Sequence, residues 1–180
     1  MQAFLLLAVV ASAVAALFDL RTREIPNWVS LGTLVVGIAA HVGYGAARVD
    51  GMAGLRAGGM ALVGALACGL VPFVFWQKGA FGGGDVKMMA AVGACLMPLD
   101  GIEAEFYALI CAAVVAPAQL AWEGKLLKTL GNVATIVLNP LRPKAKRKEV
   151  PVEAMTQLRF GPAIFVGALL CAVVHWRDRL

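Results

Sequence analysis

Long apolar runs fill most of this chain and restrict it to folds that a lipid bilayer can hold. A membrane-spanning helix needs roughly 17 to 25 largely apolar residues. Candidate runs lie at residues 2–18, 28–46, 57–76, 86–99, 104–122 and 160–176. Of the 180 residues, 61% are hydrophobic and only 15% are charged, so little sequence remains for a separate soluble domain. The sequence therefore predicts an all-α, polytopic membrane protein: one domain, 1–180, built as a bundle of about six transmembrane helices.

Two of these runs leave an alternative open. The run 86–99 is short enough to be a re-entrant or interfacial segment instead of a full span. The first run could belong to a cleaved secretory signal, because Ala11, Ala13 and Ala15 resemble a small-residue cleavage site. A signal peptide has a basic start, however, and here Arg21 and Arg23 follow the apolar run instead of preceding it. A retained first span is therefore the favoured interpretation.

The basic residues predict how the chain is oriented. Threading six spans with Arg21 and Arg23 in the cytoplasm puts 12 of the 16 Lys and Arg residues on the cytoplasmic side. The exceptions are Arg48, Arg56, Arg177 and Arg179. An excess of Lys and Arg marks the cytoplasmic loops of membrane proteins, so this threading is preferred over its inverse.

The connection 123–159 is the least apolar part of the chain. Apolar residues recur at helical spacing between 126 and 137, which predicts an interfacial helix along the inner leaflet. The basic run PLRPKAKRKE, residues 140–149, follows it. Such clusters bind anionic membrane lipid, and a basic patch alone is weak evidence for nucleic acid, so lipid is the expected partner and nucleic acid is not.

An acidic residue stands directly after three glycines in FGGGDVKMMA, residues 81–90. Acidic side chains in or beside membrane spans are costly and usually functional, so Asp85 calls for a partner. In the six-span threading, Asp19 at the end of the first run lies on the same side of the membrane. If the first and fourth spans are neighbours, the two carboxylates can face each other. The plainer alternatives are a helix N-cap for Asp85 and an interfacial charge beside Arg21 for Asp19.

Two neighbouring carboxylates have a defined chemistry. They cannot comfortably both ionise, so the pair tends to hold a single proton. The ionised member can take a proton from a water that attacks a peptide carbonyl, while the protonated member donates to the carbonyl oxygen. Which residue plays which part stays open. Gly82, Gly83 and Gly84 allow backbone conformations closed to other residues and let another backbone approach closely, as an extended substrate strand beside the acid would need.

Three stretches together resemble the signatures of type IV prepilin peptidases: FDLRTREIPN (18–27), FGGGDVKMMA and RFGPAIFVGAL (159–169). These are polytopic aspartyl proteases with a GxGD motif, which reads GGGD here. The resemblance implies that Asp19 and Asp85 are the catalytic pair. It also implies that the protein removes the leader peptide of prepilin-like substrates at the cytoplasmic face of the bacterial inner membrane, without a metal or other cofactor.

The cysteines separate this chain from the longer relatives, which carry paired CxxC zinc ligands and also methylate the new amino terminus. Here no two cysteines have CxxC spacing, so that zinc site cannot be assembled. Cys68, Cys95, Cys111 and Cys171 all lie in apolar runs and are expected to pack as small hydrophobic residues. The chain therefore resembles the short, monofunctional form associated with tight-adherence (Flp) pili. A presenilin-like protease fits less well, because FDL and GPA do not match its motifs.

Several nearby residues have both a structural and a functional interpretation. Lys87 is expected to snorkel to the interface, with a role in holding substrate as the alternative. Asn27 marks the break before the second run, with substrate contact as the alternative. Gly161 and Pro162 open the sixth run, and Gly161 is the candidate for close backbone approach to the acids.

Two further expectations complete the sequence interpretation. His41 and His175 fall near the outer ends of their runs and are expected at the membrane interface. The alternative function is a non-catalytic pilus-assembly subunit or a carrier that binds a proton or cation on the same two aspartates.

Overall fold

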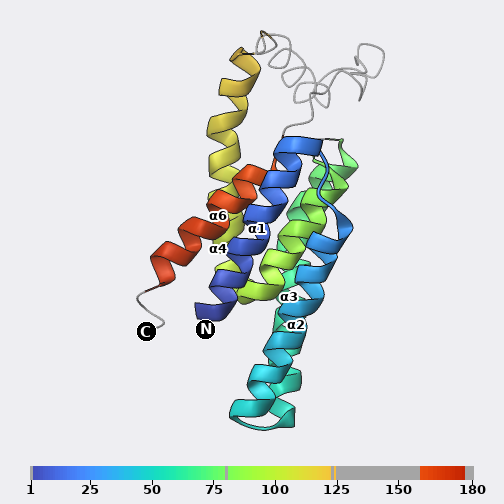
Figure 1. Cartoon of the computed structure of the whole chain (residues 1–180), viewed down its shortest axis with the longest axis vertical. Coiled ribbons are helices and arrows are strands. Elements are labelled where there is room, and N and C mark those ends of the chain that lie inside the picture. Colours follow the sequence, from blue (N-terminus) through green and yellow to red (C-terminus); the bar gives the residue numbers. More distant parts are fainter. Residues whose placement is uncertain (1, 80, 123, 125–158, 177–180) are drawn as a thin grey trace, which may run out of the picture.

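The computed structural model describes residues 2–79, 81–122, 124 and 159–176 (Figure 1). The described chain is all-α, as predicted. Its helices are α1 (Gln2–Thr22), α2 (Asn27–Arg48), α3 (Gly51–Gln77), α4 (Gly83–Trp122) and α6 (Gly161–His175). The helix predicted between 126 and 137 and the basic run 140–149 lie outside the described residues.

Element α4 is a hairpin of two arms and not a straight rod. Met97, with φ 65° and ψ 175°, interrupts the helical backbone. In a straight helix Gly93 and Gly101 would be about 12 Å apart, because they are separated by eight residues. Here a Cβ placed on Gly101 would lie only 3.0 Å from the Cα of Gly93, so the chain folds back between them. Figure 1 accordingly shows the first arm running toward the end of the bundle where α1 begins, and the second arm running back. The predicted runs 86–99 and 104–122 are therefore these two arms.

The position of this turn corrects the sequence interpretation, which left a gap at residues 100–103. The break falls earlier, at Met97 and Pro98, and residues 100–103 are helical. Proline disfavours helical backbone at the residue before it, so Pro98 contributes to the break at Met97. Asp100 and Glu103 therefore stand on the second arm and not in a loop.

Small residues hold the helices together at close range. A Cβ on Gly64 of α3 would overlap the carbonyl oxygen of Gly93 in α4, and one on Gly167 of α6 would overlap the carbonyl oxygen of Ala104. Within lipid, helices associate through such close packing because lipid tails are as apolar as the side chains. The second arm of α4 is thereby fixed against α6, and the first arm against α3.

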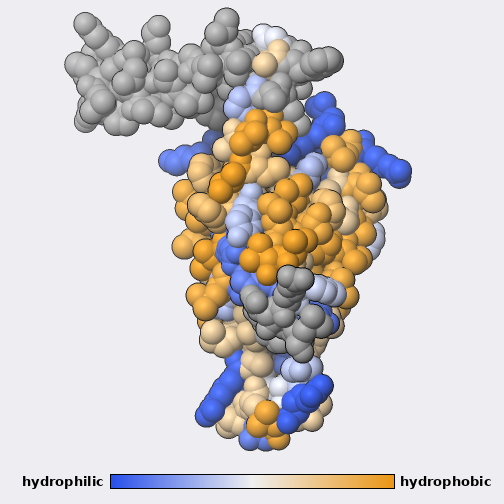
Figure 2. All heavy atoms as spheres, turned by 90° about the vertical axis from the view of Figure 1, so that its left-hand side faces the viewer, coloured by the Kyte–Doolittle hydropathy of each residue, from blue (hydrophilic) through white to orange (hydrophobic). Residues whose placement is uncertain are grey.

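The outer surface fits a lipid environment. Helices α1, α2 and α3 are each long and apolar enough to cross a membrane, whereas α6 is a shorter apolar helix of 15 residues. Large apolar side chains such as Val10, Leu66 and Val173 are exposed on these helices. Figure 2 shows apolar side chains over the middle of one face and hydrophilic ones mostly toward its two ends. The chain is a membrane protein, and the total of about six spans stays a prediction.

Candidate functional site

Asp19 lies in the last turn of α1 and meets the start of α6. Its side chain is buried, with 6% exposure, and its Oδ2 accepts a hydrogen bond of 2.9 Å from the backbone N–H of Gly161. A Cβ on Gly161 would lie 2.8 Å from both the Cβ and the Oδ2 of Asp19. Glycine is therefore required here to bring the α6 backbone within hydrogen-bonding distance of this carboxylate.

Asp85 lies in the first turn of α4 and is equally buried, with 6% exposure. Its Oδ2 accepts a hydrogen bond of 3.0 Å from the backbone N–H of Gly82, the residue before the helix. An acidic side chain at the third helical position that reaches back to the N-cap N–H forms half of a capping box. Asp85 thus stabilises the helix start, although from the third position and not as the N-cap itself.

The three glycines before Asp85 act differently from the sequence expectation. None of Gly82, Gly83 and Gly84 has a positive φ, so the unusual conformations that glycine allows are not used here. What matters at Gly84 is its small size, because a Cβ there would lie 3.0 Å from the Cβ of Ile25. Ile25 is buried and belongs to the connection between α1 and α2. The backbone that approaches Gly84 closely is therefore the protein's own connection between α1 and α2.

Further contacts bring the two acidic residues to the same end of the bundle. Phe81, just before α4, stacks on Phe160, just before α6, with ring centroids 4.3 Å apart. Phe160 is almost fully buried. Asp19 accepts from Gly161, the residue after Phe160, and Asp85 accepts from Gly82, the residue after Phe81, so this stack brings the two carboxylates to the same region. In Figure 1 the end of α1 and the starts of α4 and α6 lie toward one end of the molecule. We call Asp19 and Asp85 the acidic pair.

The electrostatic setting of the acidic pair follows from these positions. Asp85 sits in the first turn of α4, and Asp19 accepts its hydrogen bond from the first residue of α6. The N-terminus of a helix carries partial positive charge and stabilises an anion. Two buried carboxylates repel each other more strongly than exposed ones because less water screens them. We therefore expect the pair to hold one proton between its two members.

Lys87 and Asn27 join two segments beside the acidic pair. The Nζ of Lys87 donates a hydrogen bond of 2.9 Å to the Oδ1 of Asn27, the first residue of α2. Both side chains are exposed. The connection between α1 and α2 is thus held against the start of α4 by two contacts. Ile25 packs against Gly84, and Asn27 accepts the hydrogen bond from Lys87. This contact was not predicted, because the two residues are distant along the chain and no local pattern links them.

Pro162 occupies the beginning of α6. Proline fits the first turn of a helix because its fixed φ suits the helix and its missing N–H would have no partner within it. It therefore starts α6 where the Gly161 N–H reaches Asp19, while its own ring is only partly buried. No direct contact of Pro162 with the acidic pair is needed for this role.

The histidines do not join the acidic pair. His41 is 3% exposed, stacks on Phe4 with centroids 3.8 Å apart, and its Nε2 lies 2.9 Å from the carbonyl oxygen of Cys95. Ring stacking and this polar contact hold His41 inside the protein, and its position at the depth of the membrane interface stays a prediction. His175 ends α6, at the far end of that helix from Gly161.

Residues able to hold a metal ion also lie away from the acidic pair. Within the described part of the chain, three side chains with suitable ligand atoms gather at Glu103, Cys171 and His175. Both Cys171 and His175 lie in the C-terminal half of α6. This group was not recognised from the sequence, although Cys171 and His175 are one helical turn apart.

Comparison with known proteins gives one match. A family model described as "Type IV leader peptidase family" matches residues 5–117, most of the chain. The matched stretch contains Asp19, Asp85 and the three glycines, and it ends before α6. Comparisons with curated proteins and with solved structures return no match.

Proposed function

Because the chain belongs to the type IV leader peptidase family, whose members are aspartic proteases, we propose that Asp19 and Asp85 are its catalytic residues. The observation that carries this proposal is the acidic pair itself. Two buried carboxylates from helices distant in sequence lie at one end of the bundle, and each accepts a backbone N–H. Intramembrane acids arranged in this way are expected to be functional.

The reaction is hydrolysis of a peptide bond with one proton shared by the pair. The ionised carboxylate takes a proton from water as the water oxygen forms a bond to the peptide carbonyl carbon. At the same time, the protonated carboxyl group gives its proton to the carbonyl oxygen, producing a neutral tetrahedral intermediate. This exchange reverses the protonation of the two residues.

The second half of the reaction restores the starting state. The carbon–nitrogen bond breaks as the carboxyl group that took the water proton passes it to the leaving nitrogen. A hydroxyl proton of the intermediate moves to the other carboxylate as the carbonyl re-forms. The products are a free acid and a free amine, and the pair again holds one proton.

Main-chain contacts prepare the pair for this chemistry. The Gly161 N–H fixes Asp19, and the Gly82 N–H fixes Asp85, so neither carboxylate must be ordered during the reaction. Fixed catalytic groups lower a barrier because their orientation is established before the substrate reacts. The contacts at Ile25 and Asn27 hold the neighbouring connection in place.

The substrate we propose is a prepilin-like protein with a polar leader followed by an apolar helix. Arg21, Arg23, Lys78, Lys87 and Arg159 are near the helix ends that meet at the acidic pair. Basic residues favour the cytoplasmic side of a membrane, so we place this end at the cytoplasmic face of the bacterial inner membrane. A site at that boundary can cut where a leader meets the membrane-embedded helix. The absence of CxxC pairs supports the short, Flp-type form.

The test is cleavage of a prepilin-type substrate by the purified protein, read by mass spectrometry of the new amino terminus. We expect Asp19→Asn and Asp85→Asn each to slow cleavage by about 10²- to 10⁴-fold while the protein stays folded. The matched control is Asp50→Asn, because Asp50 caps α3 through its Oδ1 and Asn caps equally well. Cleavage at the wild-type rate by either site variant would overturn the assignment. An intact substrate with folded wild-type protein would favour the carrier or assembly-subunit alternative.

A further inference from the structure

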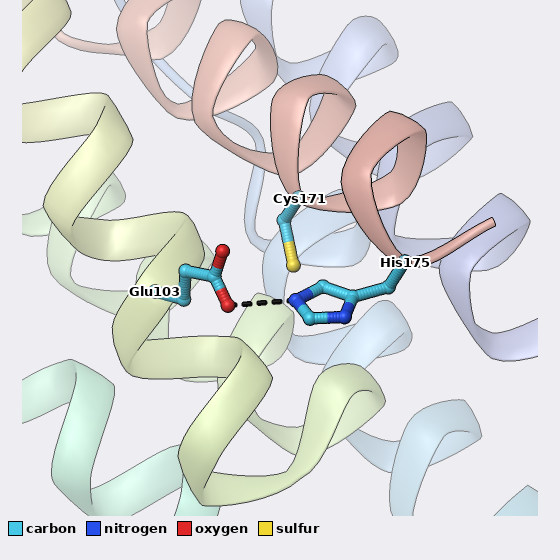
Figure 3. A group of neighbouring side chains, drawn as sticks. All are labelled: Glu103, Cys171 and His175. Atoms are coloured by element: carbon cyan, nitrogen blue, oxygen red, sulfur yellow. Dashed lines mark hydrogen bonds and ion pairs between the residues drawn. The ribbon is translucent and has the colours of Figure 1, made fainter. Parts of the chain in front are cut away.

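Three side chains of different chemistry converge on the part of α6 away from Asp19. Glu103 comes from the second arm of α4, and Cys171 and His175 come from α6 (Figure 3). One carboxylate oxygen, the thiol sulfur and one ring nitrogen lie within 4.8 Å of one another. His175 is fourteen residues beyond Gly161, which is about 21 Å along a helix. This group is therefore separate from the acidic pair.

Helical spacing aims these side chains at one another. Cys171 and His175 are four residues apart on α6, so both project from the same helix face. Glu103 and Tyr107 have the same spacing on α4. The Tyr107 hydroxyl donates a hydrogen bond of 2.6 Å to Oε1 of Glu103, while Oε2 lies 2.7 Å from Nε2 of His175. The carboxylate is therefore held at both of its oxygens.

The arrangement suits a metal site better than a catalytic relay. In a Cys–His–acid relay, the nucleophile contacts one ring nitrogen and the acid contacts the other. Figure 3 shows that the ring nitrogen bonded to Glu103 is also the one facing Cys171, and that the second nitrogen points away. All three groups therefore approach a single point, as ligands around one ion do.

The ligand types select the ion. Zinc binds Cys sulfur at about 2.3 Å, His nitrogen at about 2.0 Å and carboxylate oxygen at about 2.0 to 2.2 Å, usually in tetrahedral geometry. Tetrahedral bonds of these lengths separate ligand atoms by roughly 3.3 to 3.7 Å. The separations here run from 2.7 Å to no more than 4.8 Å, so small side-chain rotations would reach that geometry. Magnesium and calcium prefer oxygen ligands alone.

We propose that Glu103, Cys171 and His175 bind a divalent transition-metal ion of the zinc type. Glu103 and His175 are partly exposed, which gives the ion a path from the surface, while Cys171 is fully buried. The Cys171 thiol also contacts the carbonyl oxygen of Asp100 at 3.4 Å, and binding would replace its proton with the metal. Three protein ligands leave a fourth position for water. The bound ion would join α6 to the second arm of α4.

The test uses Co²⁺ as a spectroscopic probe on the full-length protein in detergent, after chelator treatment. We expect one Co²⁺ per chain, a thiolate-to-cobalt charge-transfer band, and loss of that band when Zn²⁺ is added. Cys171→Ser should abolish the band, and His175→Gln or Glu103→Gln should weaken Co²⁺ binding at least tenfold. Tyr107→Phe should weaken it by about 10- to 100-fold, because it removes the partner that orients the carboxylate.

The control is Cys111→Ser, a cysteine on the same arm of α4 as Glu103, and it should keep both the band and the affinity. A wild-type protein without a thiolate band would overturn the proposal. So would a band that persists in Cys171→Ser or unchanged Co²⁺ affinity in His175→Gln. If Cys171→Ser does not fold, thermal unfolding of folded Glu103→Gln decides: at one Zn²⁺ concentration, Zn²⁺ should raise the Tm of wild type clearly more than that of the variant, and equal shifts would overturn the proposal.

Discussion

Replacing Gly161 with alanine tests the contact between α6 and Asp19. The new methyl carbon would lie 2.8 Å from both Cβ and Oδ2 of Asp19, where ordinary contacts begin at 3.4 Å. Relief requires the two groups to separate by about 0.6 Å. The hydrogen bond from the Gly161 N–H, now 2.9 Å, would lengthen to about 3.5 Å and be lost as an effective bond.

The expected effect of Gly161→Ala is larger on activity than on folding. Because displacement of a catalytic group by about 1 Å can cost 10²-fold, we expect the single-turnover cleavage rate to fall by about 10- to 100-fold. Overpacking should lower the free energy of unfolding by about 1 to 3 kcal/mol. The assay is leader cleavage under single-turnover conditions in detergent, combined with a thermal unfolding curve.

Gly32→Ala is the matched control for this substitution. No atom lies within 4 Å of a Cβ placed on Gly32, which is inside α2. Alanine there should leave cleavage unchanged and raise helix stability by up to about 1 kcal/mol. If Gly161→Ala cleaved as fast as wild type, the close approach of α6 to Asp19 would have no part in catalysis.

Three further outcomes follow from the same contacts. Cleavage, measured as kcat/KM, should have a bell-shaped pH dependence. Below the optimum both acids are protonated and no base remains, and above it both are ionised and no acid remains. A value of kcat/KM that does not change with pH would contradict a shared proton. Lys87→Met should lower cleavage several-fold. It should lower the free energy of unfolding by less than about 1 kcal/mol, because Lys87 and its hydrogen-bond partner Asn27 are both exposed. The control Lys78→Met, at another exposed lysine, should change neither cleavage nor stability. Phe160→Ala should lower the free energy of unfolding, measured in mixed micelles, by about 3 to 5 kcal/mol, because it removes a buried ring stacked on Phe81. The control Phe106→Ala removes an exposed ring and should cost far less. Equal losses would show that the stack is unimportant.

The helices were largely predictable because apolar runs mark what lipid can surround. The residues at which the helices begin and end were less predictable, since helices continue past the last apolar residue. Helix α3 begins at Gly51, six residues before the predicted start, because Asp50 caps it through a 2.6 Å hydrogen bond to the Ala53 N–H. That signal was present, as an acidic N-cap residue often starts a helix. Pro98 likewise marked the turn at Met97.

The candidate site was predictable where a motif named the residue and not where packing decided the contact. Asp85 after its glycines and Asp19 before its basic residues could be selected from sequence. The hydrogen bond from Gly161 to Asp19 depends on how α6 crosses α1, which no local pattern encodes. Glu103 was missed for the same reason, because its relation to Cys171 and His175 exists only once α4 packs against α6.

The most direct test of the central claim is a double-mutant comparison of Asp19→Asn, Asp85→Asn and the combined variant in single-turnover cleavage. If the acidic pair works as one proton-sharing unit, each single substitution removes about 10²- to 10⁴-fold in rate. The combined variant should then be no slower than the more impaired single one, because either change already disables the unit. Losses that multiply in the combined variant would show two independent contributions and contradict the shared-proton mechanism.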